Sequence, residues 1–247
     1  MFVRAELKEQ AKAIIRNKYF HMVLVSLIAM FLTGSMLEIS IDTETETAMM
    51  SLFDRVSFSV NYEKALLMAV PVGIVGLLWA LFVVNPATVG VDCYFKHCTY
   101  DEEKFEDVWS GFKLNYGHNV KTLAIRELKV FLWTLCFIVP GIMKAYSYYF
   151  VPYLLSDYPE LESDEILEMS EKMTKGIRFE IFVLGLSFFL WQLLAALTSW
   201  ITLGLSGALL QPYVSQTMAQ LYHWAKLNRL DLKEESEFVY GTESDLL

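Results

Sequence analysis

Long uncharged stretches separated by short charged segments dominate the pattern of the chain. The longest covers residues 181–225, which are 45 positions without Asp, Glu, Lys or Arg. A bilayer core about 30 Å thick needs roughly 20 apolar residues of helix, so this stretch predicts two membrane spans folded back on each other. Residues 19–37 and 65–91 are also uncharged, and each is long enough for one span. Proline removes a backbone hydrogen bond, so Asn85-Pro86 should kink the second of these helices.

The centre of the chain allows two arrangements. Uncharged stretches cover residues 130–143 and 145–156, with Pro140-Gly141 near the junction. Each stretch is too short to cross a bilayer alone. They form either one tilted helix, which gives five spans, or two helices that meet at a Pro-Gly turn, which gives six. In the second case the first arm begins near Asn119, unless the hairpin is shallow and re-entrant.

The distribution of cations favours six spans. With five spans and a cytoplasmic N-terminus, nine Lys and Arg residues lie inside and eight outside; with six spans, 15 lie inside and two outside. Membrane proteins retain Lys and Arg on the cytoplasmic side. We therefore predict an all-α, polytopic membrane helix bundle of about six transmembrane helices, with both termini cytoplasmic. A single membrane domain covers residues 1–230, with spans at about 19–37, 65–91, 119–139, 142–156, 179–199 and 202–225.

The segments outside these spans carry their own patterns. Residues 1–18 place Leu7, Ala11, Ile14 and Ile15 on one side of a helix that also bears five cations. This is either an amphipathic helix on an anionic membrane face or a plain lead-in to the first span. Residues 157–176 predict a second amphipathic helix on the cytoplasmic face, beginning near Ser163. Alternation across residues 56–62 hints at a short strand, and residues 231–247 form an acidic tail that we expect to be flexible.

Composition excludes several classes of function. The chain carries a net charge of −9, which offers no footprint for nucleic acid. Its three cysteines make no disulfide framework. Cys93, His97 and Cys98 invite a metal interpretation, but no second ligand cluster completes a four-ligand site, so we expect no metal. No phosphate-binding loop, metalloprotease motif or nucleophile elbow is present in the sequence, so we expect no cofactor, no catalytic residues and no enzymatic activity.

The polar residues of the centre are the candidate site. Arg126, Glu127 and Lys129 precede the hairpin, and a charge held inside a membrane often marks a pathway or binding site. The alternative, which we favour, is that these side chains lie at the level of the lipid headgroups. Lys144, beyond the turn, is expected to reach the outer headgroups.

Four positions are structural candidates, namely Pro86, Pro140, Gly141 and Pro212. Asn85-Pro86 followed by Tyr94-Phe95 is similar to Gln211-Pro212 followed by Tyr222-His223. This similarity suggests a weak internal repeat of parallel helices, with chance as the alternative.

Several of these motifs resemble those of a bacterial membrane family known as domain of unknown function 975. The residues that carry the resemblance are Arg4–Lys8 (RAELK), Phe131-Leu-Trp133, Ile138–Ile142 (IVPGI), Lys144-Ala-Tyr146-Ser-Tyr148, Pro152-Tyr153 and Gln211-Pro212-Tyr213. The family is similar in layout to the membrane domain of some glycerophosphodiesterases, which implies a six-helix module, and its members imply a Gram-positive origin. It brings no catalytic residues to this chain.

Two functions remain open from the sequence. The first is a non-enzymatic module of the cell membrane that binds membrane lipid or a membrane protein partner. The second is a small transporter or lipid-handling protein with a polar site near Arg126 and Glu127. An intramembrane enzyme has the least support.

Overall fold

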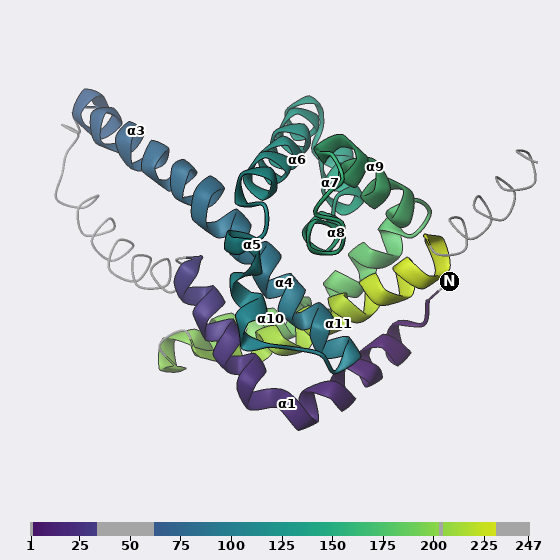
Figure 1. Cartoon of the computed structure of the whole chain (residues 1–247). Helices are drawn as coiled ribbons and strands as arrows, with labels where there is room; N and C mark the ends of the chain where they lie inside the picture. Colours follow the sequence, from purple (N-terminus) through teal and green to yellow (C-terminus); the bar gives the residue numbers. More distant parts are fainter. Residues whose placement is uncertain (1, 34–61, 203–204, 231–247) are drawn as a thin grey trace, which may run out of the picture.

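The computed structural model describes residues 2–33, 62–202 and 205–230, and every element in these ranges is a helix (Figure 1). The α-helices are α1 (Arg4–Leu32), α3 (Tyr62–Trp79), α4 (Asn85–Tyr100), α5 (Ser110–Lys113), α6 (Tyr116–Cys136), α7 (Ile138–Ser147), α8 (Val151–Asp157), α9 (Ser163–Thr174), α10 (Arg178–Thr202) and α11 (Leu205–Arg229). A π-helix, η1 (Ala80–Val84), and a 3-10 helix, η2 (Phe105–Trp109), complete the set. The all-α prediction is confirmed for this part of the chain. Apart from Tyr62, the expected strand lies outside the described residues, as does the acidic tail.

Three described helices are long and apolar enough to cross a membrane: Arg4–Leu32, Gly73–Tyr100 and Arg178–Ser199. They coincide with three of the six expected spans. Helix α11 is equally long, but it carries Gln211, Gln216 and Gln220 and buries most of its C-terminal half in the core. Its polar side chains explain why its hydropathy is lower than that of α10.

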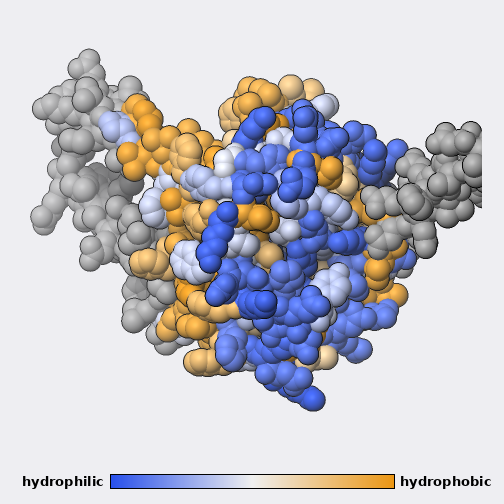
Figure 2. Space-filling model, in the orientation of Figure 1, coloured by the Kyte–Doolittle hydropathy of each residue, from blue (hydrophilic) through white to orange (hydrophobic). Residues whose placement is uncertain are grey.

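Helices α4, α8 and α11 form the centre of the fold, and α1 packs along α11. The largest fully buried side chains include Phe95, Phe150, Tyr153 and Tyr222, with the rings of Tyr153 and Tyr222 stacked at 4.9 Å. In contrast, α3 projects away from the other described helices (Figure 1). Hydrophobic surface gathers on α3 and at the upper end of the α6–α7 hairpin (Figure 2).

Helices α4 and α11 run in the same sense. Thr88 and Gln211 line one cavity at the start of the pair, and the Tyr100 hydroxyl lies 2.7 Å from His223 Nδ1 at its end. Both helices carry their proline, Pro86 or Pro212, near the start, and both prolines are buried. The two segments proposed as a repeat therefore lie side by side, although the repeat itself stays a prediction.

A π-helix, η1, directly precedes Asn85-Pro86, and the kink expected there stays a prediction. In an α-helix the Phe82 carbonyl would accept a hydrogen bond from residue 86, and proline has no N–H. The hydroxyl of Tyr116, at the start of α6, donates to this carbonyl at 2.8 Å. The carbonyl that proline leaves without its usual donor is thus satisfied by another helix.

The central hairpin differs from its expected form. The chain turns at Phe137, which is extended between α6 and α7, and Pro140 and Gly141 lie within the first turns of α7. Proline is tolerated there because the first N–H groups of a helix have no intrahelical partner. Gly141 is the point of close approach, since a Cβ there would lie 2.2 Å from the Thr134 hydroxyl oxygen.

The second arm of the hairpin is also shorter than the sequence predicted. Residues 142–156 are not one helix, because α7 ends at Ser147 and α8 begins at Val151. Ten residues of α7 extend only about 15 Å, half of a bilayer core. The segment expected to form the span 142–156 is therefore two short helices, and its passage through a membrane stays a prediction.

Lys144 was expected to reach the outer headgroups, but it lies against α9. It binds Glu171 of α9 at 2.9 Å, so the end of α7 lies against the amphipathic helix that was placed at the cytoplasmic face. Helix α9 begins at Ser163, as predicted, and buries Ile166, Leu167 and Met173.

The N-terminal amphipathic pattern is confirmed, but two of its five cations, Lys8 and Lys18, are half-buried against other parts of the protein. Leu7 and Ala11 are buried against the core. Lys8 donates to the Ser187 hydroxyl at 2.7 Å and lies 4.4 Å from the centre of the Phe188 ring. Lys18 binds both Asp101 and Glu103. These contacts make residues 4–18 a packed part of the fold as well as a lead-in to the first span.

Candidate functional site

A polar cavity of about 350 Å³ lies between α4, α6, α7, α8 and α11. Arg126 and Glu127 line it from α6, and Asp92 lines it from α4. The tyrosines Tyr148, Tyr149 and Tyr153 contribute hydroxyl and ring surface, and Val130 and Met218 contribute apolar surface. The cavity therefore combines charges of both signs with aromatic and aliphatic walls.

Arg126 is held by its neighbour. Its Nε donates to the Glu127 carboxylate at 3.1 Å, and a second guanidinium nitrogen donates to the same oxygen. The Arg126 side chain is 21% exposed and that of Glu127 is 50% exposed. Arg126 thus lies deeper in the cavity, while Glu127 reaches its opening.

Asp92 is the charged residue of this cavity that sequence analysis missed as a site residue. In the sequence it directly follows the uncharged residues 65–91, at the end of an expected span. In the structure it lies within reach of a hydrogen bond from Tyr153 and is attracted by Arg126. Burial and the Asp92 carboxylate raise the pKa of Tyr153 well above its ordinary value of 10.0, so this hydroxyl stays protonated and can donate. Nothing in the spacing of charged residues along the chain indicates that Asp92 meets α6.

Lys129 does not join the cavity. It binds Asp164 of α9 at 2.9 Å in an exposed ion pair. The structure therefore brings together two of the three polar candidates, Arg126 and Glu127, and leaves the third at the surface.

Pro212 precedes the cavity-lining Val214 and follows Gln211, which is also in the wall. Pro86 lies six residues before Asp92, two residues after the end of the π-helix.

A second cavity adjoins the first. It measures about 450 Å³ and lies between α1, α10 and α11, with a mainly apolar wall that includes Ala29, Ala196 and Leu210. Gln211 and Val214 line both cavities. The Gln211 amide donates to Ser215 at 3.0 Å, so this side chain is held in place between the two.

A buried ion cluster lies at the end of α8, in the core of the fold. Asp157 binds Lys96 and Lys226, and the Tyr222 hydroxyl donates to it at 2.5 Å. Burial alone would raise the pKa of Asp157, but the Lys96 and Lys226 ammonium groups hold it below its ordinary value of 3.8. All carboxylate bonds are made within the protein, so the cluster fixes α4, α8 and α11 together and offers no open site.

The family description "Protein of unknown function (DUF975)" matches residues 1–228. The chain belongs to the DUF975 family. This match extends over nearly the whole chain and confirms the resemblance carried by the hairpin motif. No curated protein and no solved structure matches the chain. The expected likeness in layout to glycerophosphodiesterase membrane domains is not shown by the DUF975 match and stays a prediction.

Proposed function

We propose that this protein is a non-enzymatic membrane protein whose polar cavity binds the headgroup of a zwitterionic phospholipid. The observation that carries the proposal is the pairing of Arg126 with Asp92 and Glu127 around one cavity. A guanidinium group recognises phosphate through parallel hydrogen bonds. Carboxylates and aromatic rings recognise an ammonium group. A headgroup that carries both a phosphate and an amine matches this arrangement better than an anion alone, because acidic and basic side chains line the same cavity.

The surroundings of the cavity support a lipid rather than a water-soluble ligand. The end of the α6–α7 hairpin exposes Phe131, Leu132, Trp133, Leu135, Phe137 and Ile138. An apolar surface of this kind is stable when lipid covers it. Val130 belongs to the cavity wall and begins the apolar part of α6, so acyl chains could extend along the hairpin while the headgroup stays at Arg126.

A re-entrant hairpin is the membrane arrangement that fits these contacts. Lys129 and Lys144 bind acidic residues of α9, so both arms start from the α9 side. The seven residues from Val130 to Cys136 rise only about 10 Å. We propose that the hairpin enters one leaflet and returns, with α9 and both termini on the cytoplasmic side of the cell membrane. The six-span arrangement predicted from the sequence is thereby replaced, in this proposal, by one with a shallow hairpin.

The proposal is tested by lipid binding to the full chain, purified in mild detergent and examined by native mass spectrometry. Phosphatidylethanolamine should bind at least tenfold more tightly than phosphatidylglycerol. Arg126→Gln and Asp92→Asn should each remove this preference. Lys129→Gln is the matched control, because Lys129 lies on the same helix outside the cavity, and it should leave binding unchanged. Equal binding of both lipids by the wild-type chain, unaffected by Arg126→Gln, would contradict the proposal.

A second candidate function is the movement of lipid between leaflets. It is favoured by the π-helix η1, which ends one turn before the cavity residue Thr88, because π-helical turns frequently occur at functional sites. Proteoliposomes with fluorescent phosphatidylethanolamine in both leaflets test this directly. Bleaching of well over half the fluorescence by an impermeant reductant would support lipid movement. Bleaching of half, in vesicles that contain the protein, would leave lipid binding as the function.

A further inference from the structure

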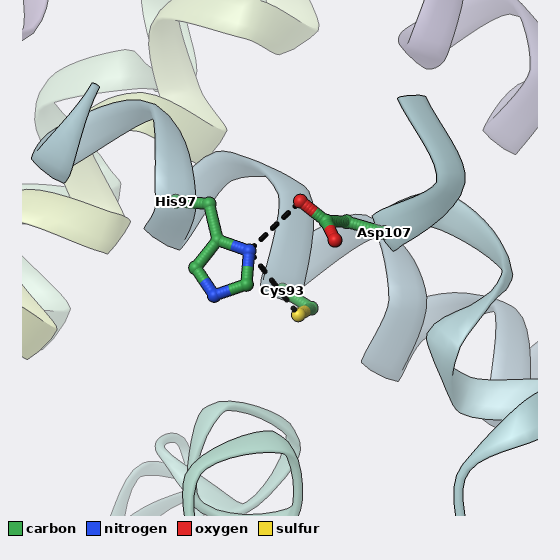
Figure 3. Close-up of side chains that lie close together, drawn as sticks. All are labelled: Cys93, His97 and Asp107. Carbon is green, nitrogen blue, oxygen red and sulfur yellow. Dashed lines mark hydrogen bonds and ion pairs between the residues drawn. The ribbon is translucent and has the colours of Figure 1, made fainter. Parts of the chain in front are cut away.

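Three potential metal ligands converge beside α4, away from the proposed lipid cavity (Figure 3). Cys93 and His97 lie one turn apart on α4, with 3.9 Å between Sγ and Nδ1. Asp107, from the 3-10 helix η2, places Oδ2 2.8 Å from the same Nδ1. The three ligand atoms all lie within 4.8 Å of one another. The sequence shows no second ligand cluster near Cys93 and His97, and in the structure Asp107 of η2 adds a third ligand.

With a neutral Cys93 thiol, hydrogen bonding leaves one of these contacts unsatisfied. His97 Nδ1 has one position, which holds either a proton or a lone pair. With a proton, it donates to Asp107 and cannot accept from the Cys93 thiol. Without a proton, Nδ1 accepts from the Cys93 thiol, but its lone pair then faces the Asp107 carboxylate with no hydrogen between them. A cation at the point where the three atoms converge would satisfy all of them.

The position of Asp107 is fixed by backbone packing. A Cβ on Gly90 of α4 would lie 1.9 Å from the Val108 carbonyl oxygen, so only glycine allows η2 to come this close. Asp107 also accepts a hydrogen bond from the Lys104 backbone N–H at 2.9 Å, which orients the carboxylate. The ligand from η2 is therefore held against the two ligands of α4 before any ion arrives, which lowers the cost of binding.

We propose that Cys93, His97 and Asp107 bind a divalent transition-metal ion, with Zn²⁺ as the best fit. Sulfur, nitrogen and oxygen donors are the three ligand types of zinc, at about 2.0–2.3 Å from the ion. Calcium and magnesium prefer oxygen donors throughout. The ion would separate Nδ1 from Oδ2 by several tenths of an ångström, which a rotation of the half-exposed His97 ring accommodates. Three protein ligands leave a fourth position open to water or to another ligand.

Cobalt(II) is the probe that reports both the metal and the thiolate. The full chain is purified in detergent, treated with a chelator and titrated with Co²⁺, then with Zn²⁺ in competition. One equivalent of Co²⁺ should produce a thiolate-to-cobalt charge-transfer band in the near ultraviolet, and Zn²⁺ should abolish it. Cys93→Ser should remove the band, and His97→Ala and Asp107→Asn should each weaken binding at least tenfold. The double variant Cys98→Ser/Cys136→Ser, which keeps only the proposed ligand thiol, should retain the band.

Two spectroscopic results would overturn the proposal. The first is a wild-type chain that shows no thiolate band. The second is a band that persists in Cys93→Ser and disappears in the Cys98/Cys136 double variant. Because Cys93→Ser could impair folding, the melting temperature of the wild-type chain gives a second readout. Zn²⁺ should raise it in the wild type and in the Cys98/Cys136 variant, and the absence of any rise would also refute the site. None of these readouts depends on lipid binding at Arg126.

Discussion

The Tyr116 hydroxyl donates a hydrogen bond to the Phe82 carbonyl, 2.8 Å away, at the place where Pro86 removes the usual helical donor. Removing this hydroxyl in Tyr116→Phe should destabilise the protein by about 1 kcal/mol, the typical net value of one hydrogen bond. The ring remains, so its stacking on Phe112 is preserved. Thermal unfolding in detergent measures the change.

The matched control for this variant is Tyr19→Phe. The Tyr19 hydroxyl lies 3.4 Å from the Leu209 carbonyl oxygen, which is a much weaker contact. Its loss should therefore change stability by less than that of Tyr116. Equal losses in the two variants would show that the contact with Phe82 has no special role.

Two glycines should be intolerant of alanine. A Cβ on Gly90 would lie 1.9 Å from the Val108 carbonyl oxygen, and one on Gly111 would lie 1.9 Å from the Pro86 carbonyl oxygen. Backbone atoms cannot rotate away, so Gly90→Ala and Gly111→Ala should each cost about 1–3 kcal/mol by overpacking. Gly117→Ala is the control, because nothing lies within 4 Å of its position. It should be neutral or stabilising by up to about 1 kcal/mol, and destabilisation as large as that of Gly90→Ala would refute the steric argument.

Asp157 should matter more to stability than any exposed acid. It is bound by Lys96, whose side chain is only 5% exposed, and by Lys226. Asp157→Asn leaves two ammonium groups without their carboxylate, and breaking a buried pair in this way typically costs about 3–5 kcal/mol. Asp164→Asn breaks the surface pair with Lys129 and should cost less than about 1 kcal/mol. Chemical denaturation of both variants compares them, and similar midpoints would contradict this role.

The same cluster predicts sensitivity to acid. Lys96 and Lys226 hold the pKa of Asp157 below 3.8 despite burial, and Lys144 and Arg178 hold the pKa of Glu171 below 4.5. A carboxylate with a lowered folded-state pKa stabilises the protein above its unfolded pKa and loses this contribution as the pH falls through the folded value. The melting temperature should therefore be steady near neutrality and decline below about pH 4. The decline should be smaller in Asp157→Asn, and an equal decline would exclude Asp157 as its source.

Cysteine labelling separates a re-entrant hairpin from a full span. Cys136 is exposed at the end of α6, and Cys93 and Cys98 are buried. With Cys93 and Cys98 replaced by serine, an impermeant maleimide should not label Cys136 from outside intact cells. Glu168→Cys, on the exposed face of α9, should be labelled only in inverted vesicles. Labelling of Cys136 from outside would show that the hairpin crosses the bilayer.

The uncharged stretches predicted helices well because length and apolarity are local properties. Residues 19–37 and 181–202 lie in helices of membrane length where the structure describes them, and Ser163 begins α9 as its charge pattern indicated. Pro140-Gly141 predicted the wrong position for the turn of the hairpin, which lies at Phe137. Proline interrupts a helix where a backbone N–H must donate a hydrogen bond, and no such donor is needed at the third residue of α7.

Contacts between elements that lie far apart in the chain could not be predicted from the sequence. Arg126 and Glu127 were identified by their charge in an apolar setting, but their meeting with Asp92 depends on how α6 packs against α4. Asp107 similarly joins Cys93 only because Gly90 lets η2 approach. Single glycines of this kind look like any other small residue along a chain.

In the proposed membrane arrangement, the α6–α7 hairpin rises only about 10 Å into the bilayer, so it would occupy one leaflet and leave the other untouched. Its bulky end, with Phe131, Trp133 and Phe137 exposed, would widen that leaflet relative to its partner. Insertion of apolar side chains into one side of a membrane is sensitive to curvature. The protein should therefore concentrate where the cytoplasmic leaflet is already stretched, as on a strongly curved membrane. Its accumulation should then increase that curvature.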